Sequence, residues 1–82
     1  MKLKKGCIYQ YTRKYTAKIF KSEIDTLDNS CYAGVLNPND CFIALENGFQ
    51  ENKILTDNGI IGWRHFMIAD IKRIKASKKT TV

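Results

Sequence analysis

The chain has 82 residues and a formal net charge of +6. A chain this short has room for one hydrophobic core, which excludes a second domain. Apolar residues at 44% and charged residues at 27% exclude a disordered chain. No apolar run approaches the roughly 20 residues of a membrane span, and the N-terminal apolar run is too short for a secretory signal. We therefore expect one soluble domain over residues 1–82, without membrane contact.

The first predicted strand is "GCIYQYT", residues 6–12, where side chains alternate with period two and aromatic residues are enriched. A long loop is expected over residues 12–31. Within it, "SEIDTLDNS" has a capping serine and two apolar residues on one helical face, but it is long enough for only a turn or two of helix. We therefore expect a strand followed by a long, mostly irregular connection.

Turns and short strands alternate through the rest of the chain. After "YAGVL" comes the turn "NPND", whose proline presets one φ angle. The strands "CFIALE" and "NKILT" follow, and Asn58-Gly59 between apolar runs predicts a tight hairpin with a type I′ turn. "IIGWR" is the next strand, and "FMIADIKRI" predicts a short helical turn that leads into the last strand.

These elements predict an all-β domain. The pattern favours a small, strongly bent antiparallel barrel over about residues 3–75. It consists of five short strands, with one long loop after the first strand and a short helical turn before the last strand. Gly62 supports the bend, because a glycine inside a strand often marks a sharp bend or a close approach of another backbone. The polar, basic tail over residues 76–82 is expected to be mobile.

The order of these elements resembles the SH3 and bacterial SH3-like domains. The resemblance rests on "LNPNDCFIALE", "ENKILTDNGIIGWR" and the closing "ADIKRI", and it covers about residues 6–74. Its most specific part is "DNGIIGW", because in these domains a Gly-aromatic pair after the distal hairpin leads through a 3-10 turn into the last strand. The resemblance implies a five-stranded SH3-like barrel. In size and layout the chain is also similar to small SH3-like proteins of tailed phages.

The resemblance also implies a candidate partner-binding site. "CIYQY" resembles the first-strand A-L-Y-D-Y motif, which places Tyr9 and Tyr11 at the two groove tyrosines, and Trp63 falls at the groove aromatic. The chain departs from the family at "NKILT", which has no tryptophan at its start, and at "RHFMIAD", which lacks the S-N-Y element. These departures argue against a full groove for P-x-x-P ligands. Tyr9 and Tyr11 share one strand face, so both are packed or both are exposed, while Trp63 is either a packing residue or a ligand platform.

Charge is distributed unevenly, with basic ends and an acidic middle. In an SH3-like barrel the first and last strands lie side by side, so we expect the two ends to merge into one basic face. The predicted basic face consists of Lys2, Lys4, Lys5, Lys72, Arg73 and Lys75. The acidic residues of the loop at 22–31 are expected to lie away from it.

The reactive side chains give no sign of a catalytic or metal site. Cys7, Cys31 and Cys41 form an odd set without a C-x-x-C spacing, and the single histidine, His65, is far from them in sequence. We expect three reduced, buried thiols, no disulfide, no metal and no cofactor. No P-loop, H-E-x-x-H or G-x-S-x-G motif is present, so we do not expect an enzyme.

Two functions remain open. The first is a noncatalytic SH3-like binding or assembly module that engages a protein partner. Under this hypothesis the chain itself is a phage-encoded structural or accessory protein, located in the host cytoplasm or the virion. The second is a small basic nucleic-acid-binding barrel, whose lysines neutralise phosphates while Tyr9, Tyr11 or Trp63 stack on bases. The net charge of +6 suits both an acidic protein surface and nucleic acid, so it does not discriminate between them.

Overall fold

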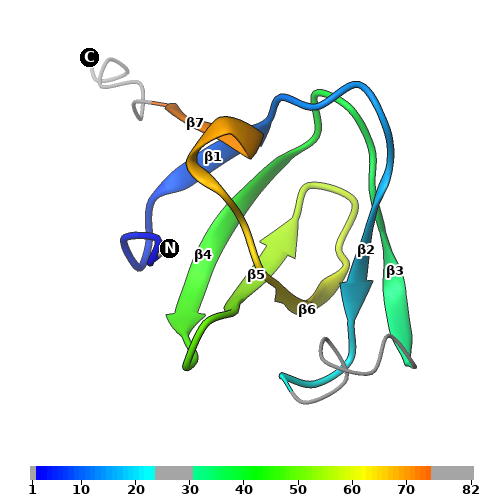
Figure 1. Cartoon of the computed structure of the whole chain (residues 1–82), viewed down its shortest axis with the longest axis vertical. Coiled ribbons are helices and arrows are strands. Elements are labelled where there is room, and N and C mark those ends of the chain that lie inside the picture. Colours follow the sequence, from blue (N-terminus) through cyan, green and yellow to red (C-terminus); the bar gives the residue numbers. More distant parts are fainter. Residues whose placement is uncertain (1, 24–30, 75–82) are drawn as a thin grey trace.

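The computed structural model describes residues 2–23 and 31–74 of the chain. Within these ranges the protein is all-β, as predicted, and its strands form one antiparallel sheet in the order β3-β2-β6-β5-β4-β1-β7 (Figure 1). The strands are β1 (Ile8–Tyr11), β2 (Ala17–Phe20), β3 (Tyr32–Leu36), β4 (Cys41–Asn47), β5 (Asn52–Thr56), β6 (Ile61–Arg64) and β7 (Ile71–Ile74). The 3-10 turn η1 (Ile68–Asp70) precedes β7, where a short helical turn is predicted. No helix in the described ranges is long and apolar enough to span a membrane.

Two strands lie at or beside the predicted loop. β2 falls inside the region 12–31 and β3 follows it directly, so the described chain has seven strands and not the predicted five. β2 is only four residues long, which makes its local sequence signal weak. Most of the helical turn predicted at 22–30, and all of the tail at 76–82, lie outside the described residues.

The β5–β6 hairpin forms at Asn58-Gly59 as predicted, but its turn is not of type I′. A type I′ turn needs positive φ at both central residues, whereas here Gly59 has a φ of 86° and Asn58 does not have a positive φ. The Gly59 N–H donates to the Thr56 carbonyl at 2.9 Å, and the Thr56 N–H donates to the Ile60 carbonyl at 2.9 Å. These two hydrogen bonds are typical of a three-residue loop with a glycine bulge.

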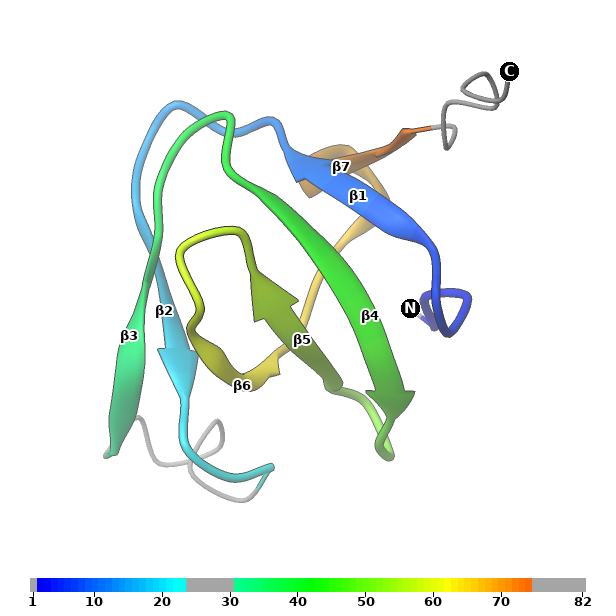
Figure 2. The ribbon, with the colours of Figure 1, turned by 180° about the vertical axis from the view of Figure 1, so that it is seen from behind.

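The first and last strands pair, as expected. β1 lies between β4 and β7, with Ile8 opposite Ile74 and Tyr11 opposite Ile71. Figures 1 and 2 show β1 and β7 together at one end of the sheet, while β3 forms the other end. Segments from the two ends of the described chain therefore meet beside the β1–β7 pair.

Gly62 lets β2 approach β6 closely. β2 joins β6 at Phe20, which lies opposite Trp63. A Cβ atom at Gly62 would lie 2.5 Å from the Ile19 Cγ2 atom and 2.6 Å from the Phe20 carbonyl oxygen. Gly62 does not have a positive φ. The glycine is therefore explained by the space that β2 needs, not by an unusual backbone conformation.

The core fills the inner face of the sheet. The Tyr9 and Phe42 ring centroids are 5.9 Å apart, and the Phe42 and Phe66 centroids are 5.0 Å apart, so three rings stack across this face. Phe66 belongs to the segment after β6, which crosses in front of β4 and β5 in Figure 1. The buried apolar cluster comprises Leu3, Tyr9, Tyr11, Ala17, Ile19, Leu36, Phe42, Ala44, Ile54, Phe66 and Ile71.

Candidate functional site

A row of aliphatic side chains crosses the outer face of the sheet. In five neighbouring strands the register sets one aliphatic residue directly beside the next, and directly opposed residues of antiparallel strands lie on the same face. We call this set the outer row; in the order β7-β1-β4-β5-β6 it consists of Ile74, Ile8, Ile43, Leu55 and Ile61. Figure 2 views the sheet from this side, with the segment that carries Phe66 behind it.

The outer row is accessible to solvent. Ile8 is 38% exposed and Ile61 is 51% exposed, while the other three members are half-buried. The alternate residues of the same strands fill the core, so this part of the sheet is apolar on both faces. An antiparallel sheet with one face in water normally carries polar residues on that face. A contiguous apolar surface on the outside of a small domain is therefore a candidate docking surface.

A hollow lies near the middle of the outer row, over β1, β4 and the end of β5. It has a volume of about 260 Å³ and is lined by Ile8, Cys41, Phe42, Ile43, Leu55, Thr56 and Asp57. Asp57 is held at its rim, because its Oδ2 atom accepts a hydrogen bond of 3.3 Å from the Cys41 N–H. The rest of the lining is mostly apolar, so the hollow suits an aliphatic or aromatic side chain from a partner.

Five cations of the predicted basic face gather beside the β1–β7 pair. They are exposed, and none of them belongs to either ion pair of the described residues, which are Arg13–Asp70 and Lys53–Glu46. The five are Lys2, Lys4, Lys5, Lys72 and Arg73. Lys72 lies opposite Gln10 and Arg73 opposite Tyr9, so these two side chains point to opposite faces of β7. The cations therefore surround one end of the sheet and do not form a single flat face; Lys75 lies outside the described residues.

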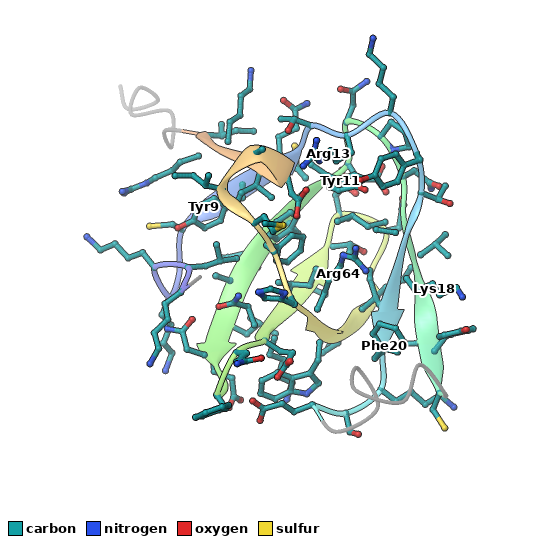
Figure 3. All side chains as sticks on the ribbon, in the orientation of Figure 1. Tyr9, Tyr11, Arg13, Lys18, Phe20 and Arg64 are labelled. Atoms are coloured by element: carbon teal, nitrogen blue, oxygen red, sulfur yellow. The ribbon has the colours of Figure 1, made fainter. Side chains whose placement is uncertain are left out.

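Tyr9 and Tyr11 are core residues. They are 6% and 1% exposed, so they are packed together, and neither ring offers a face to a partner in this structure. The Tyr9 hydroxyl accepts a hydrogen bond of 2.8 Å from the Lys4 N–H, whereas the Tyr11 hydroxyl has no hydrogen-bond partner among the described residues. Burial raises the pKa of Tyr11 above its usual value, although the nearby Arg64 opposes the shift. Figure 3 shows Tyr11 beside Arg13 near the end of β1.

Trp63 lies on the outer side of β6 and is half-buried. It is opposite Lys53 on one side and Phe20 on the other, so it extends the apolar surface beyond the outer row toward β2. Phe20 packs edge-on against Tyr32, and the Lys18 ammonium lies 4.6 Å from the Tyr32 ring centroid. Of the three predicted partner-binding residues, Trp63 alone has part of its surface accessible.

Asp70 fixes the turn between β6 and β7. Its Oδ1 atom accepts a hydrogen bond of 2.6 Å from the Arg13 Nε–H, and its Oδ2 atom accepts one of 2.7 Å from the Met67 N–H. Burial raises the pKa of this carboxyl, but the Met67 N–H and the Arg13 guanidinium outweigh it, so the pKa lies below its usual range. The interaction is structural, since it ties η1 to the end of β1.

The histidine and the thiols lie apart from any metal-binding group within residues 2–23 and 31–74. His65 is exposed, and no three His, Cys, Asp or Glu side chains in that part of the chain are grouped to hold a metal ion. The three thiols are unpaired; Cys7 and Cys41 are half-buried, but Cys31 is exposed, which corrects the expectation that all three are buried.

The outer row was missed in the sequence, although one signal for it was present. "CFIAL" in β4 is a continuous apolar run, and such a run is typical of a strand with both faces covered. Comparison with family models, with curated proteins and with solved structures found no match to this chain.

Proposed function

We propose that this chain is a noncatalytic SH3-like module that binds a protein partner through the outer row. The observation that carries the proposal is the register of five aliphatic residues across five neighbouring strands, on the face of the sheet opposite the core. Five strands at roughly 4.8 Å spacing give a surface about 19 Å wide, which is of the size that a folded partner or a short helix covers.

Three features support the SH3-like assignment. β1 pairs with both β4 and β7, a 3-10 turn leads into the last strand, and a Gly-Trp pair lies on the strand before that turn. In this assignment β1, β4, β5, β6 and β7 are the five barrel strands, and β2 and β3 form a hairpin in the connection between β1 and β4. Gly62 supports a curled sheet, because it allows this hairpin to lie against β6.

The surroundings of the outer row define the chemistry of the partner. The hollow takes one apolar side chain, which would be the centre of the interface. Lys72 is next to the row on β7, and Lys4 and Lys5 precede β1 at the same end of the sheet. These cations favour acidic residues around the apolar contact, since opposite charges at an interface speed association and select the correct partner. The proposed partner is therefore a protein with an apolar side chain flanked by acidic residues.

A basic nucleic-acid-binding barrel is the second candidate, because the five cations beside β1 and β7 have no ion-pair partner among the described residues. Binding of single strands usually adds aromatic stacking to charge. The burial of Tyr9 and Tyr11 removes two of the three predicted stacking rings, whereas the outer row has no use in phosphate binding. The protein-binding proposal accounts for both surfaces, so we favour it.

The test is affinity capture from an extract of the cells that naturally contain the protein, with the immobilised full chain as bait. Ile43→Ser changes the middle of the outer row, and Phe49→Ser is the matched control, because Phe49 is 86% exposed on the β4–β5 hairpin and lies outside the row. We expect a protein that is retained by the wild-type and Phe49→Ser baits, is lost with Ile43→Ser and survives nuclease treatment. Equal retention of the protein by the wild-type and Ile43→Ser baits would contradict the proposal. Loss of the retained protein after nuclease treatment would also contradict it, and would favour binding to nucleic acid.

A further inference from the structure

The N-terminal segment folds back onto the core. Within this segment, residues 2–5, which we call the strap, Leu3 is 2% exposed and belongs to the core cluster, whereas Lys2, Lys4 and Lys5 are exposed. Figure 1 shows this segment curled beside β1 and β4. The strap is thus attached by one apolar side chain between charged neighbours.

Side-chain atoms recognise the backbone of the strap. The Leu3 N–H donates a hydrogen bond of 3.2 Å to the Asn52 Oδ1 atom, and the Lys4 N–H donates one of 2.8 Å to the Tyr9 hydroxyl. Asn52 and Tyr9 come from different strands, β5 and β1, and both are buried. Proteins hold extended peptides with elements of this kind: polar side chains that bind main-chain N–H groups, next to a site for one apolar side chain.

A hinge connects the strap to β1. Gly6 has a φ of 84°, and the Cys7 N–H donates to the Lys4 carbonyl at 3.1 Å, so residues 4–7 form a tight turn. The Gly6 N–H also donates to the Ala44 carbonyl at 2.8 Å, which fixes the third residue of the turn against β4. The strap can therefore leave its site by a change at one glycine, without disturbing the strand pairs of β1.

The strap is held weakly for a core element. Within the described residues, one buried side chain and two hydrogen bonds to side chains attach the strap, while ordering the strap costs backbone freedom and restricts lysine side chains. Segments of this kind open at a lower free energy than the whole domain unfolds.

We propose that the site under the strap is a peptide-binding site that the chain closes with its own residues. Its ligand is an extended segment of a partner protein that carries a leucine or similar side chain and has backbone N–H groups at that residue and the next. A proline at either position would remove a donor, so proline-rich ligands are excluded there. The proposal is independent of the outer row, which lies on the opposite face of the sheet.

The test measures binding of a fluorescein-labelled peptide with the sequence of residues 1–6, MKLKKG, to the full chain by fluorescence anisotropy. Gly6→Ala strains the turn and loosens the strap without changing the site itself, because a positive φ is unfavourable for alanine. Gly59→Ala is the matched control: it also has a positive φ and open space around its Cβ position, but it lies in the β5–β6 turn. We expect affinity for the peptide to rise about tenfold in Gly6→Ala and to stay at the wild-type value in Gly59→Ala.

A second peptide tests the recognition of the backbone. The same peptide with Lys4→Pro keeps the leucine but lacks the N–H that reaches Tyr9, so we expect it to bind Gly6→Ala at least about tenfold more weakly. Equal binding of both peptides, equal affinity of the two glycine variants, or no binding to a folded Gly6→Ala chain would overturn the proposal.

Hydrogen exchange of the wild-type chain decides the question if Gly6→Ala does not fold. We expect the Lys4 amide to exchange through a local opening, faster than the slowest amides of β4 and β5. Exchange of the Lys4 amide at the rate of those slowest amides would show that the strap leaves only on global unfolding, and would overturn the proposal.

Discussion

Replacing Gly62 by alanine adds one methyl group at the closest contact between β2 and β6. The new Cβ atom would lie 2.5 Å from Ile19 Cγ2 and 2.6 Å from the Phe20 carbonyl oxygen. Ile19 is fully buried, and the Phe20 carbonyl belongs to the backbone, so relief requires the β2–β3 hairpin to move away from β6. Overpacking of this kind costs about 1 to 3 kcal/mol of the free energy of unfolding.

Gly48→Ala is the matched comparison. A Cβ atom at Gly48 would overlap with the carboxylate of Glu23, which accepts a hydrogen bond from the Phe49 N–H. The atoms in the way belong to the end of a flexible side chain that can turn aside, so we expect a smaller cost than at Gly62, on the order of one hydrogen bond or roughly 1 kcal/mol. Urea unfolding followed by far-ultraviolet circular dichroism measures both variants against the wild type. Equal losses at the two sites, or a loss below about 0.5 kcal/mol for Gly62→Ala, would refute the argument from close approach.

The other predictions concern single groups. Tyr9→Phe should lower the free energy of unfolding by about 1 kcal/mol, because it removes the acceptor for the Lys4 N–H. Tyr11→Phe should leave the free energy of unfolding unchanged or raise it, because it removes a buried hydroxyl without a partner in the described chain. Denaturant titration of both variants checks this contrast. The folded state holds the pKa of Asp70 below its unfolded value, so the contribution of this carboxylate to stability is present above about pH 4 and is lost as the pH falls through the folded pKa. Asp70→Asn should therefore be less stable than the wild type at pH 7. In acid titrations its free energy of unfolding should fall less than that of the wild type between about pH 5 and pH 2. Chelator and reductant should leave the thermal midpoint unchanged, and a drop with either reagent would indicate a metal or disulfide contribution.

The sequence predicts the parts of the fold that depend on local chemistry. Asn58-Gly59 between apolar runs marks a hairpin because few residues besides glycine accept the positive φ that Gly59 adopts. The shared face of Tyr9 and Tyr11 also follows from strand periodicity alone. The surroundings of that face are not local: Phe42 stacks on Tyr9 and Phe66 stacks on Phe42, and both are far from Tyr9 in sequence. Periodicity alone therefore leaves open whether the two tyrosines are packed or exposed, and the tertiary structure buries them.

Long-range register explains the remaining differences. The outer row joins residues of five strands, and no segment of the sequence reveals that Ile8, Ile43 and Leu55 are neighbours until the pairing of β1, β4 and β5 is known. β2 is likewise stabilised by its neighbours β3 and β6 more than by its own four residues. The predicted basic face likewise depends on strand pairing: Lys72 and Arg73 lie on β7 beside β1, but alternation along β7 sends their side chains to opposite faces.

The most direct test of the protein-docking account is the dissociation constant of the captured partner for three forms of the full chain. The change Ile43→Ser removes most of one aliphatic side chain at the middle of the outer row and is expected to weaken binding by at least about tenfold. Phe49→Ser should bind as the wild type does. Equal dissociation constants for the wild type and Ile43→Ser, with both chains folded, would contradict the assignment of the outer row as the docking surface.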